Sequence, residues 1–181
     1  MPVRNVVLFS IASLIIPSIA VNMAHADITT TSLTISASCV PGPLSISAPG
    51  ALVFSAVSAP SMATTVSSIS TATMGTVLVT DARCDAPGTA WTASAIATAL
   101  TPPAGPTIAA SLIGYTSGVI GKTGTVAAVA VDQINLTGVV PVVTAVVTGS
   151  NTAWWTPTIT VTVPSGQAVG TYAGSITQSV A

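Results

Sequence analysis

Two aspartates close to a cysteine are the first candidates for chemistry in this sequence. In the segment DARCD, Asp81 and Asp85 stand on either side of Arg83 and Cys84. Such a carboxylate pair has the groups for acid–base catalysis or for binding a small cation. Aspartates also commonly accept hydrogen bonds from the amides of turns, and Arg83 offers Asp81 an ion pair. We favour this second, structural role for DARCD.

The rest of the chain lacks the groups that most enzymes use. It contains no glutamate, and its single histidine, His25, lies near the amino terminus. Asp132 is the one other acidic side chain after residue 85, and neither a Gly-x-Ser-x-Gly nor a phosphate-loop pattern occurs. We therefore predict a protein that is not an enzyme and that has no catalytic residues, no cofactor and no bound metal.

The first 26 residues have the pattern of a secretory signal peptide. Arg4 precedes an apolar run over residues 6–21, and Ala24 and Ala26 supply the small-x-small motif before Asp27. The run contains a proline and ends in polar residues, so it does not resemble a retained membrane helix of about 20 apolar residues. We expect a signal peptide at residues 1–26 and a single secreted domain at residues 27–181, with no membrane span in the mature chain.

Charge is scarce in the predicted mature chain. It carries two basic side chains, Arg83 and Lys122, against four aspartates. A protein without a basic patch cannot neutralise phosphates, which excludes nucleic acid as a partner. Few charges also mean little repulsion between copies, so assembly of the chain with itself stays open as an alternative.

The two cysteines, Cys39 and Cys84, predict one disulfide. In a secreted chain an even number of cysteines most simply indicates a disulfide framework. The bond would close a loop of about 45 residues, worth about 3–4 kcal/mol in the chain-entropy model. Metal ligation or redox chemistry are the alternatives, but the sequence has no CxxC spacing and no second histidine to complete such a site.

Four aromatic residues are candidates for contact with a partner: Trp91, Trp154, Trp155 and Tyr172. Adjacent residues of a strand point to opposite faces, so Trp154 and Trp155 must face opposite ways. One of them can enter the core while the other lies on the surface, where it can stack on a sugar ring or anchor a partner. The alternative for Trp91 and for one of the pair is burial in the core.

The mature chain is rich in Thr, Val, Ser, Ile and Ala, which favours strands. Alternating apolar residues predict strands at 32–38 and 158–163, and TVLVTD at 76–81 is typical of a buried strand. The segment 90–100 suits a helix or a strand, and the last two strands are predicted to form a hairpin. About nine short strands separated by Pro- and Gly-rich turns indicate an all-β, Ig-like antiparallel β-sandwich.

Several of these segments together resemble the WxL-type surface proteins of Gram-positive bacteria, especially secreted actinobacterial members. The likeness covers residues 43–55, 77–95, 107–118 and 151–180. It implies an all-β extracellular domain that associates non-covalently with the cell wall, with peptidoglycan as the partner. The chain departs from the family at both motifs. Trp91 is followed by Thr92 and Ala93 rather than by x-Leu, and after Tyr172 the expected Trp and Leu are Gln178 and Val180.

These features together predict a secreted, non-catalytic protein located in the cell wall or on the cell surface. Its expected partner is cell-wall polymer or another surface protein. A self-assembling subunit of a surface fibre or layer is the main alternative. A pore-forming envelope protein is a weaker one, because it needs longer alternating strands than this sequence suggests.

Overall fold

The computed structural model describes residues 39–54 and 68–181. The predicted signal peptide, its cleavage site at Ala24, Ala26 and Asp27, and the predicted strand at residues 32–38 lie outside the described residues. Contacts divide the chain after Cys39, and all the strands described below belong to the unit Val40–Ala181.

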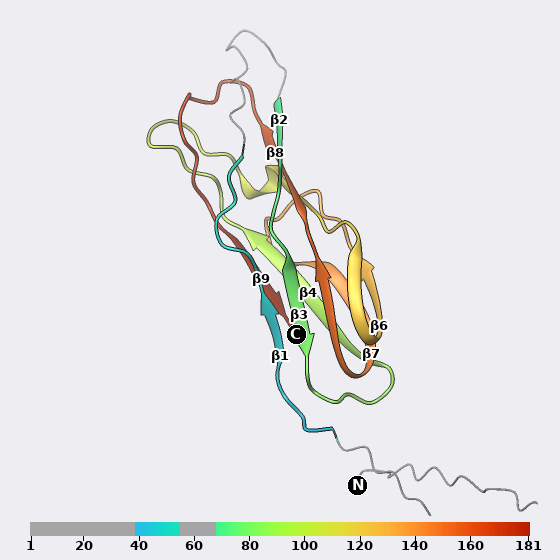
Figure 1. Cartoon of the computed structure of the whole chain (residues 1–181). Coiled ribbons are helices and arrows are strands. Elements are labelled where there is room, and N and C mark those ends of the chain that lie inside the picture. The colour runs from blue at the N-terminus through green and yellow to red at the C-terminus, as the bar shows by residue number, and fades with distance from the viewer. Residues whose placement is uncertain (1–38, 55–67) are drawn as a thin grey trace, which may run out of the picture. The chain divides into compact units, whose positions relative to one another are not determined.

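The fold is all-β, as the sequence predicts. In the described residues nine strands pair antiparallel in two sheets, and one short 3₁₀ turn, η1, occupies Ala110–Leu112 (Figure 1). The strands are β1 (Leu44–Ser47), β2 (Ser68–Thr73), β3 (Val77–Asp81), β4 (Thr89–Ala97), β5 (Ile113–Thr116), β6 (Ile120–Ala130), β7 (Val140–Trp155), β8 (Thr158–Val163) and β9 (Ile176–Val180).

The large sheet is organised around β7, which at 16 residues is longer than the short strands that the sequence suggests. β6 pairs with β7 from Val143 to Trp155. β3 pairs with the end of β7 and β4 with its beginning. Because β6 occupies one edge, β3 and β4 must follow one another along the other edge. β1 then pairs with β3, and β9 with β4.

The small sheet has the order β2-β8-β5. Its central strand, β8, shows the predicted alternation: Ile159, Val161 and Val163 are buried, and the threonines between them are partly exposed. The predicted hairpin of the last two strands is wrong. β8 pairs with β2 and β5, whereas β9 pairs with β4 in the other sheet. The twelve residues between β8 and β9 pass from one sheet to the other. Turn residues in this connection do not by themselves show that the two flanking strands pair with each other.

The core lies between the two sheets. The segment 90–100, which suits a helix or a strand, forms the strand β4 as far as Ala97. Buried and half-exposed residues alternate along β4 because one of its faces is covered. The largest fully buried side chains are Trp91, Trp155 and Tyr115. Trp155 Nε1 donates a hydrogen bond to the Tyr115 hydroxyl at 2.8 Å, and that hydroxyl donates to Gln178 Oε1 at 3.1 Å. Both buried aromatic polar groups are thereby satisfied.

Candidate functional site

The adjacent tryptophans of β7 do face opposite ways. Trp155 is 1% exposed and packs in the core, whereas Trp154 is 38% exposed on the outer face of the large sheet. The strand register explains this. Trp155 lies opposite the buried Val77 of β3, and Trp154 lies opposite Leu78, which is also exposed. The structure therefore identifies Trp154 as the outward member of the pair.

The Trp154 indole lies across the neighbouring strand rather than projecting into solvent. Its partner on β6 is Gly121, and a Cβ built on Gly121 would overlap with the indole ring. Only glycine leaves room for the ring at this position. The ring is therefore held against the sheet, with one side against β6 and the remaining surface accessible.

A row of hydroxyl groups crosses the sheet beside Trp154. The register places Ser45, Thr80, Thr152 and Thr123 side by side on β1, β3, β7 and β6. The Thr123 and Thr152 hydroxyls are hydrogen-bonded to each other, and Ser45 Oγ donates to the Thr80 carbonyl at 3.5 Å. We call the surface made by this row together with Ser47, Leu78, Trp154 and Gly121 the Trp154 face. On this face the row of hydroxyl residues and the row that contains Trp154 are two residues apart along each strand, a distance of about 6.6 Å.

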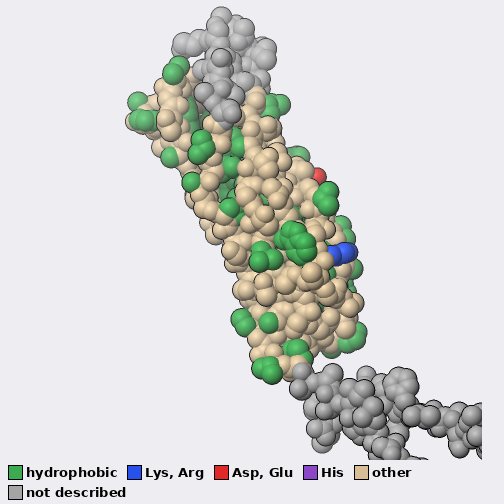
Figure 2. Space-filling model, viewed as in Figure 1, with side chains coloured by type: hydrophobic (Ala, Val, Ile, Leu, Met, Phe, Trp, Pro, Cys, Tyr) green, Lys and Arg blue, Asp and Glu red, His purple; other side chains and the backbone are tan. Residues whose placement is uncertain are grey.

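The Trp154 face contains no charged side chain. Lys122 follows Gly121 on β6 and so points to the opposite side of that strand. Asp81 is buried, and its two charged neighbours lie in the following loop. On the side of the described residues that Figure 2 shows, little red or blue appears, and most of the surface is hydrophobic side chains, other uncharged side chains or backbone. A neutral aromatic and hydroxyl surface is suited to a neutral, hydroxyl-rich ligand.

The other predicted contact residues are less accessible. Trp91 is 1% exposed, and its Nε1 donates to Asn151 Oδ1 at 3.4 Å, so it and Trp155 belong to the core. Tyr172 is half-buried, with its hydroxyl 3.0 Å from both Gln167 Oε1 and the Ala168 carbonyl. Of the four candidates, Trp154 therefore offers the most open aromatic surface.

The two segments that resemble the WxL motifs lie on neighbouring strands. Ala93 of β4 pairs with Val180 of β9, and Ala95 pairs with Gln178. Gln178 lies on β9 and is half-buried. Its Oε1 accepts the hydrogen bond from Tyr115, while its buried Nε2 has no hydrogen-bond partner in the described part of the chain. The hydrogen bond between Tyr115 of β5 and the half-buried Gln178 of β9 links the two sheets, and sequence reasoning missed this role of Gln178.

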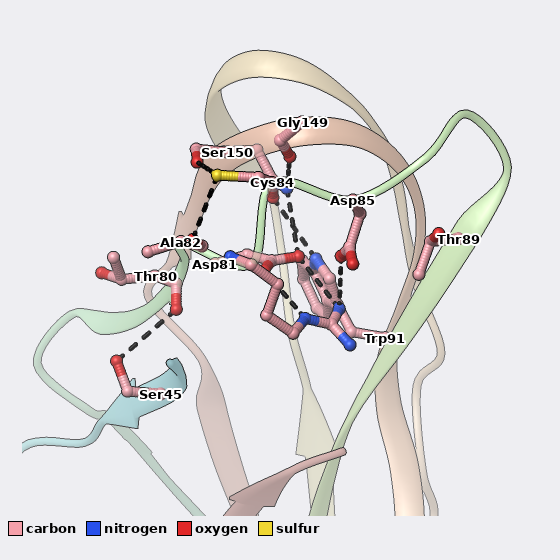
Figure 3. Close-up of polar contacts among 12 residues, drawn as sticks. Ser45, Thr80, Asp81, Ala82, Cys84, Asp85, Thr89, Trp91, Gly149 and Ser150 are labelled. Atoms are coloured by element: carbon pink, nitrogen blue, oxygen red, sulfur yellow. Dashed lines mark hydrogen bonds and ion pairs between the residues drawn. The ribbon is translucent and has the colours of Figure 1, made fainter. Parts of the chain in front are cut away.

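The DARCD segment, which contains Cys84, forms an ion cluster (Figure 3). Cys39 and Cys84 are disulfide-bonded, as predicted. Arg83 Nε lies 2.9 Å from Asp81 Oδ1, and Arg83 also pairs with Asp85 at 2.9 Å. Asn151 Nδ2 donates to Asp81 Oδ2 at 3.2 Å and so links the cluster to the Trp91 indole. The predicted structural role of Asp81 as the partner of Arg83 is confirmed.

The cluster shifts the pKa values of its two carboxyl groups, Asp81 and Asp85, in opposite directions. Hydrogen bonds from Arg83 lower the pKa of Asp81 from its ordinary value of 3.8 to about 2. Burial, followed by the charge of Asp81, raises the pKa of Asp85. A lowered native-state pKa means that Asp81 stabilises the fold above pH 3.8, and that this contribution is lost progressively as the pH falls through about 2.

We expect the variant Asp81→Asn to be less stable than the natural protein near pH 7 by roughly 1–2 kcal/mol, less than the full shift implies because Arg83 is partly exposed. The difference should shrink below pH 4 and continue to shrink as the pH falls through about 2, where Asp81 becomes protonated in the native state as well. Urea unfolding at a series of pH values measures it. A difference that stays constant down to pH 2 would contradict the ion-pair role.

A cavity of about 410 Å³ lies among the described residues, apart from the Trp154 face. Its walls are mainly apolar and come from residues 49–54, β5, β8 and the segment leading into β9, including Tyr172. Within the described ranges, no group of three or more His, Cys, Asp or Glu side chains is placed to hold a metal ion. The described residues also include no helix of sufficient length and hydrophobicity to span a membrane.

Comparison with protein-family models, with curated proteins and with solved structures finds no match to this chain.

Proposed function

We propose that this protein is a secreted, non-catalytic surface protein that binds bacterial cell-wall polymer, of the peptidoglycan class, through the Trp154 face. The observation that carries the proposal is the partly exposed Trp154 indole lying flat over Gly121 beside a row of hydroxyls. The resemblance of residues 43–55, 77–95, 107–118 and 151–180 to WxL-type surface proteins supports the choice of ligand.

The physical basis is stacking combined with hydrogen bonding. An indole presents a large, rigid apolar surface that can pack against the C–H face of a sugar ring. The neighbouring hydroxyls of Ser45, Thr80, Thr152 and Thr123 can donate to and accept from sugar hydroxyls. Since no charge takes part, binding should change little with salt concentration, unlike binding driven by ion pairs.

Replacing Trp154 by alanine tests the proposal. A central aromatic anchor typically contributes about 2 kcal/mol or more to binding, so retention on purified peptidoglycan in a co-sedimentation assay should fall at least about tenfold. The matched control is Val146→Ala, an exposed apolar residue of the same strand and face that lies outside the Trp154 face. Equal retention of both variants, or loss of binding in 0.5 M NaCl, would count against the proposal.

The glycine beneath the ring provides an independent prediction. The variant Gly121→Ala should displace the Trp154 indole, because the new Cβ would occupy the space of the ring. We expect peptidoglycan retention to fall several-fold while the urea unfolding midpoint changes little, since Gly121 lies on an exposed strand. Retention equal to that of the natural protein would mean that the position of the indole is unimportant for binding.

The alternative, a self-assembling fibre or layer, requires each copy to bind at least two others. Among the described strands, only β6 has a free edge longer than six residues. One long edge suits a pair of copies better than an extended array, so wall binding remains our first proposal.

A further inference from the structure

β6 is an edge strand whose only paired neighbour among the described strands is β7. It runs for 11 residues, and most of its side chains are exposed or half-exposed, with Val126 the buried exception. The free edge of such a strand carries backbone N–H and C=O groups that can pair with another strand. β6 is therefore the longest open edge in the described part of the fold.

The hydrogen-bonding pattern shows which residues of β6 point outward. Val131 N donates to the Val142 carbonyl at 2.8 Å, so these two directly opposite residues form a hydrogen-bonded pair. In an antiparallel ladder, hydrogen-bonded and non-hydrogen-bonded pairs alternate. Val126, Ala128 and Ala130 consequently direct their backbone N–H and C=O groups away from β7, towards the open edge.

The two halves of β6 differ in how they are protected against pairing. The first half contains Lys122 and an irregularity in register at Gly124, whose φ is +78°. Charged side chains and bulges are the usual devices that keep edge strands from pairing. The second half, TVAAVA over residues 125–130, has neither a charge, nor a proline, nor a register shift.

We propose that the second half of β6 pairs antiparallel with the same segment of a second copy, about a two-fold axis at Ala127. In this register Val126 of one copy lies opposite Ala128 of the other, and the two exchange the backbone hydrogen bonds that are open in the single chain. The contact uses the same patch on both copies, as a two-fold interface requires. Small side chains at Ala127 and Ala128 allow the close approach.

Charge complementarity selects a second copy as the partner. Outside the cluster around Arg83, the charged side chains of the described residues are Lys122, near the start of β6, and Asp132, just after its end. Antiparallel pairing about Ala127 brings Lys122 of each copy to the end of β6 where Asp132 of the other lies. Between these two pairs of opposite charges, the uncharged residues 125–130 of one copy lie against the same residues of the other.

The pairing would also double the binding surface, an aspect that rests on the proposed function. Residues directly opposite in an antiparallel pair project to the same face of the sheet. The two copies of the Trp154 face therefore lie on one side of a continuous sheet. Two linked sites on a repetitive polymer bind more tightly than one, because the second contact becomes intramolecular.

A cysteine at the axis tests the pairing without any wall polymer. In the proposed register, Ala127 meets its own copy in a non-hydrogen-bonded pair, with a Cα separation of about 4.5 Å that a disulfide can bridge. Mild oxidation of the variant Ala127→Cys should give mostly covalent dimer on a non-reducing gel. Val146→Cys, on the next strand, is the control: its two copies would be about 14 Å apart and should not be linked.

Proline at an outward-facing position provides the second test. Ala128→Pro removes an N–H that points to the open edge and not to β7, so the fold should persist. Sedimentation equilibrium should show the natural protein as a dimer, and Ala128→Pro as a monomer at a concentration where the natural protein is at least half dimeric. Cross-linking of Ala127→Cys no greater than that of Val146→Cys, or a dimer that survives Ala128→Pro, would overturn the proposal. Neither result depends on whether the protein binds peptidoglycan.

Discussion

Replacing Trp155 by alanine is expected to lower the free energy of unfolding by about 3–5 kcal/mol, the range seen when large buried aromatics are truncated. Trp155 is 1% exposed and lies between the two sheets. Its Nε1 is also the donor to the Tyr115 hydroxyl at 2.8 Å. Truncation therefore leaves a cavity and takes a hydrogen-bond partner from a buried hydroxyl, and both effects act in the same direction.

The neighbouring tryptophan is the matched control. Trp154→Ala removes the same side chain from the next position of β7, but from the solvent side, and should cost much less stability. Trp155→Phe should fall between the two, because it keeps most of the packing but loses the indole donor and part of the ring. Urea unfolding measures the order of stability of the three variants through their midpoints and slopes. A Trp154→Ala variant as unstable as Trp155→Ala would contradict the assignment of faces.

Removing the disulfide is the second change with a large expected effect. The Cys39–Cys84 bond closes a loop of about 45 residues, and its loss should lower the free energy of unfolding by about 3–4 kcal/mol. Cys84 has a φ of +60°, unusual for a residue other than glycine, which indicates that its surroundings hold the backbone in place. Reduction should therefore also weaken the ion cluster formed by its neighbours Arg83 and Asp85.

The measurement is urea unfolding of the natural protein with and without a reductant. The double variant Cys39→Ser, Cys84→Ser should match the reduced natural protein and should no longer respond to the reductant. An unfolding midpoint that stays the same after complete reduction would show that the bond contributes little to the native state.

Much of the fold was predictable because it depends on local alternation. The strand β8 was predicted from its alternating Val, Ile and Thr residues. The opposite orientation of Trp154 and Trp155 follows from strand geometry alone. Which of the two is buried was not readable, because alternation does not reveal which face of a strand another sheet covers. That depends on the pairing of β7 with β3 and β6, strands distant in sequence.

The candidate site illustrates the same limit. Its aromatic residue was recognised from the sequence, but Gly121, which makes room for the indole, precedes Trp154 by 33 residues and becomes relevant only through the register of β6 and β7. The hydroxyl row likewise gathers residues from four strands. The hairpin prediction for β8 and β9 failed for a related reason: the Gly-rich connection suits a tight turn and a sheet-to-sheet crossing equally well.

The most direct test of wall binding through the Trp154 face is acrylamide quenching of tryptophan fluorescence with and without soluble peptidoglycan fragments. Trp91 and Trp155 are each 1% exposed, so Trp154 should account for nearly all of the accessible fluorescence. Saturating fragments should protect it, so that quenching falls to the level of the Trp154→Ala variant. Unchanged quenching at fragment concentrations that saturate binding would show that the polymer contacts another surface, and would contradict the proposed site.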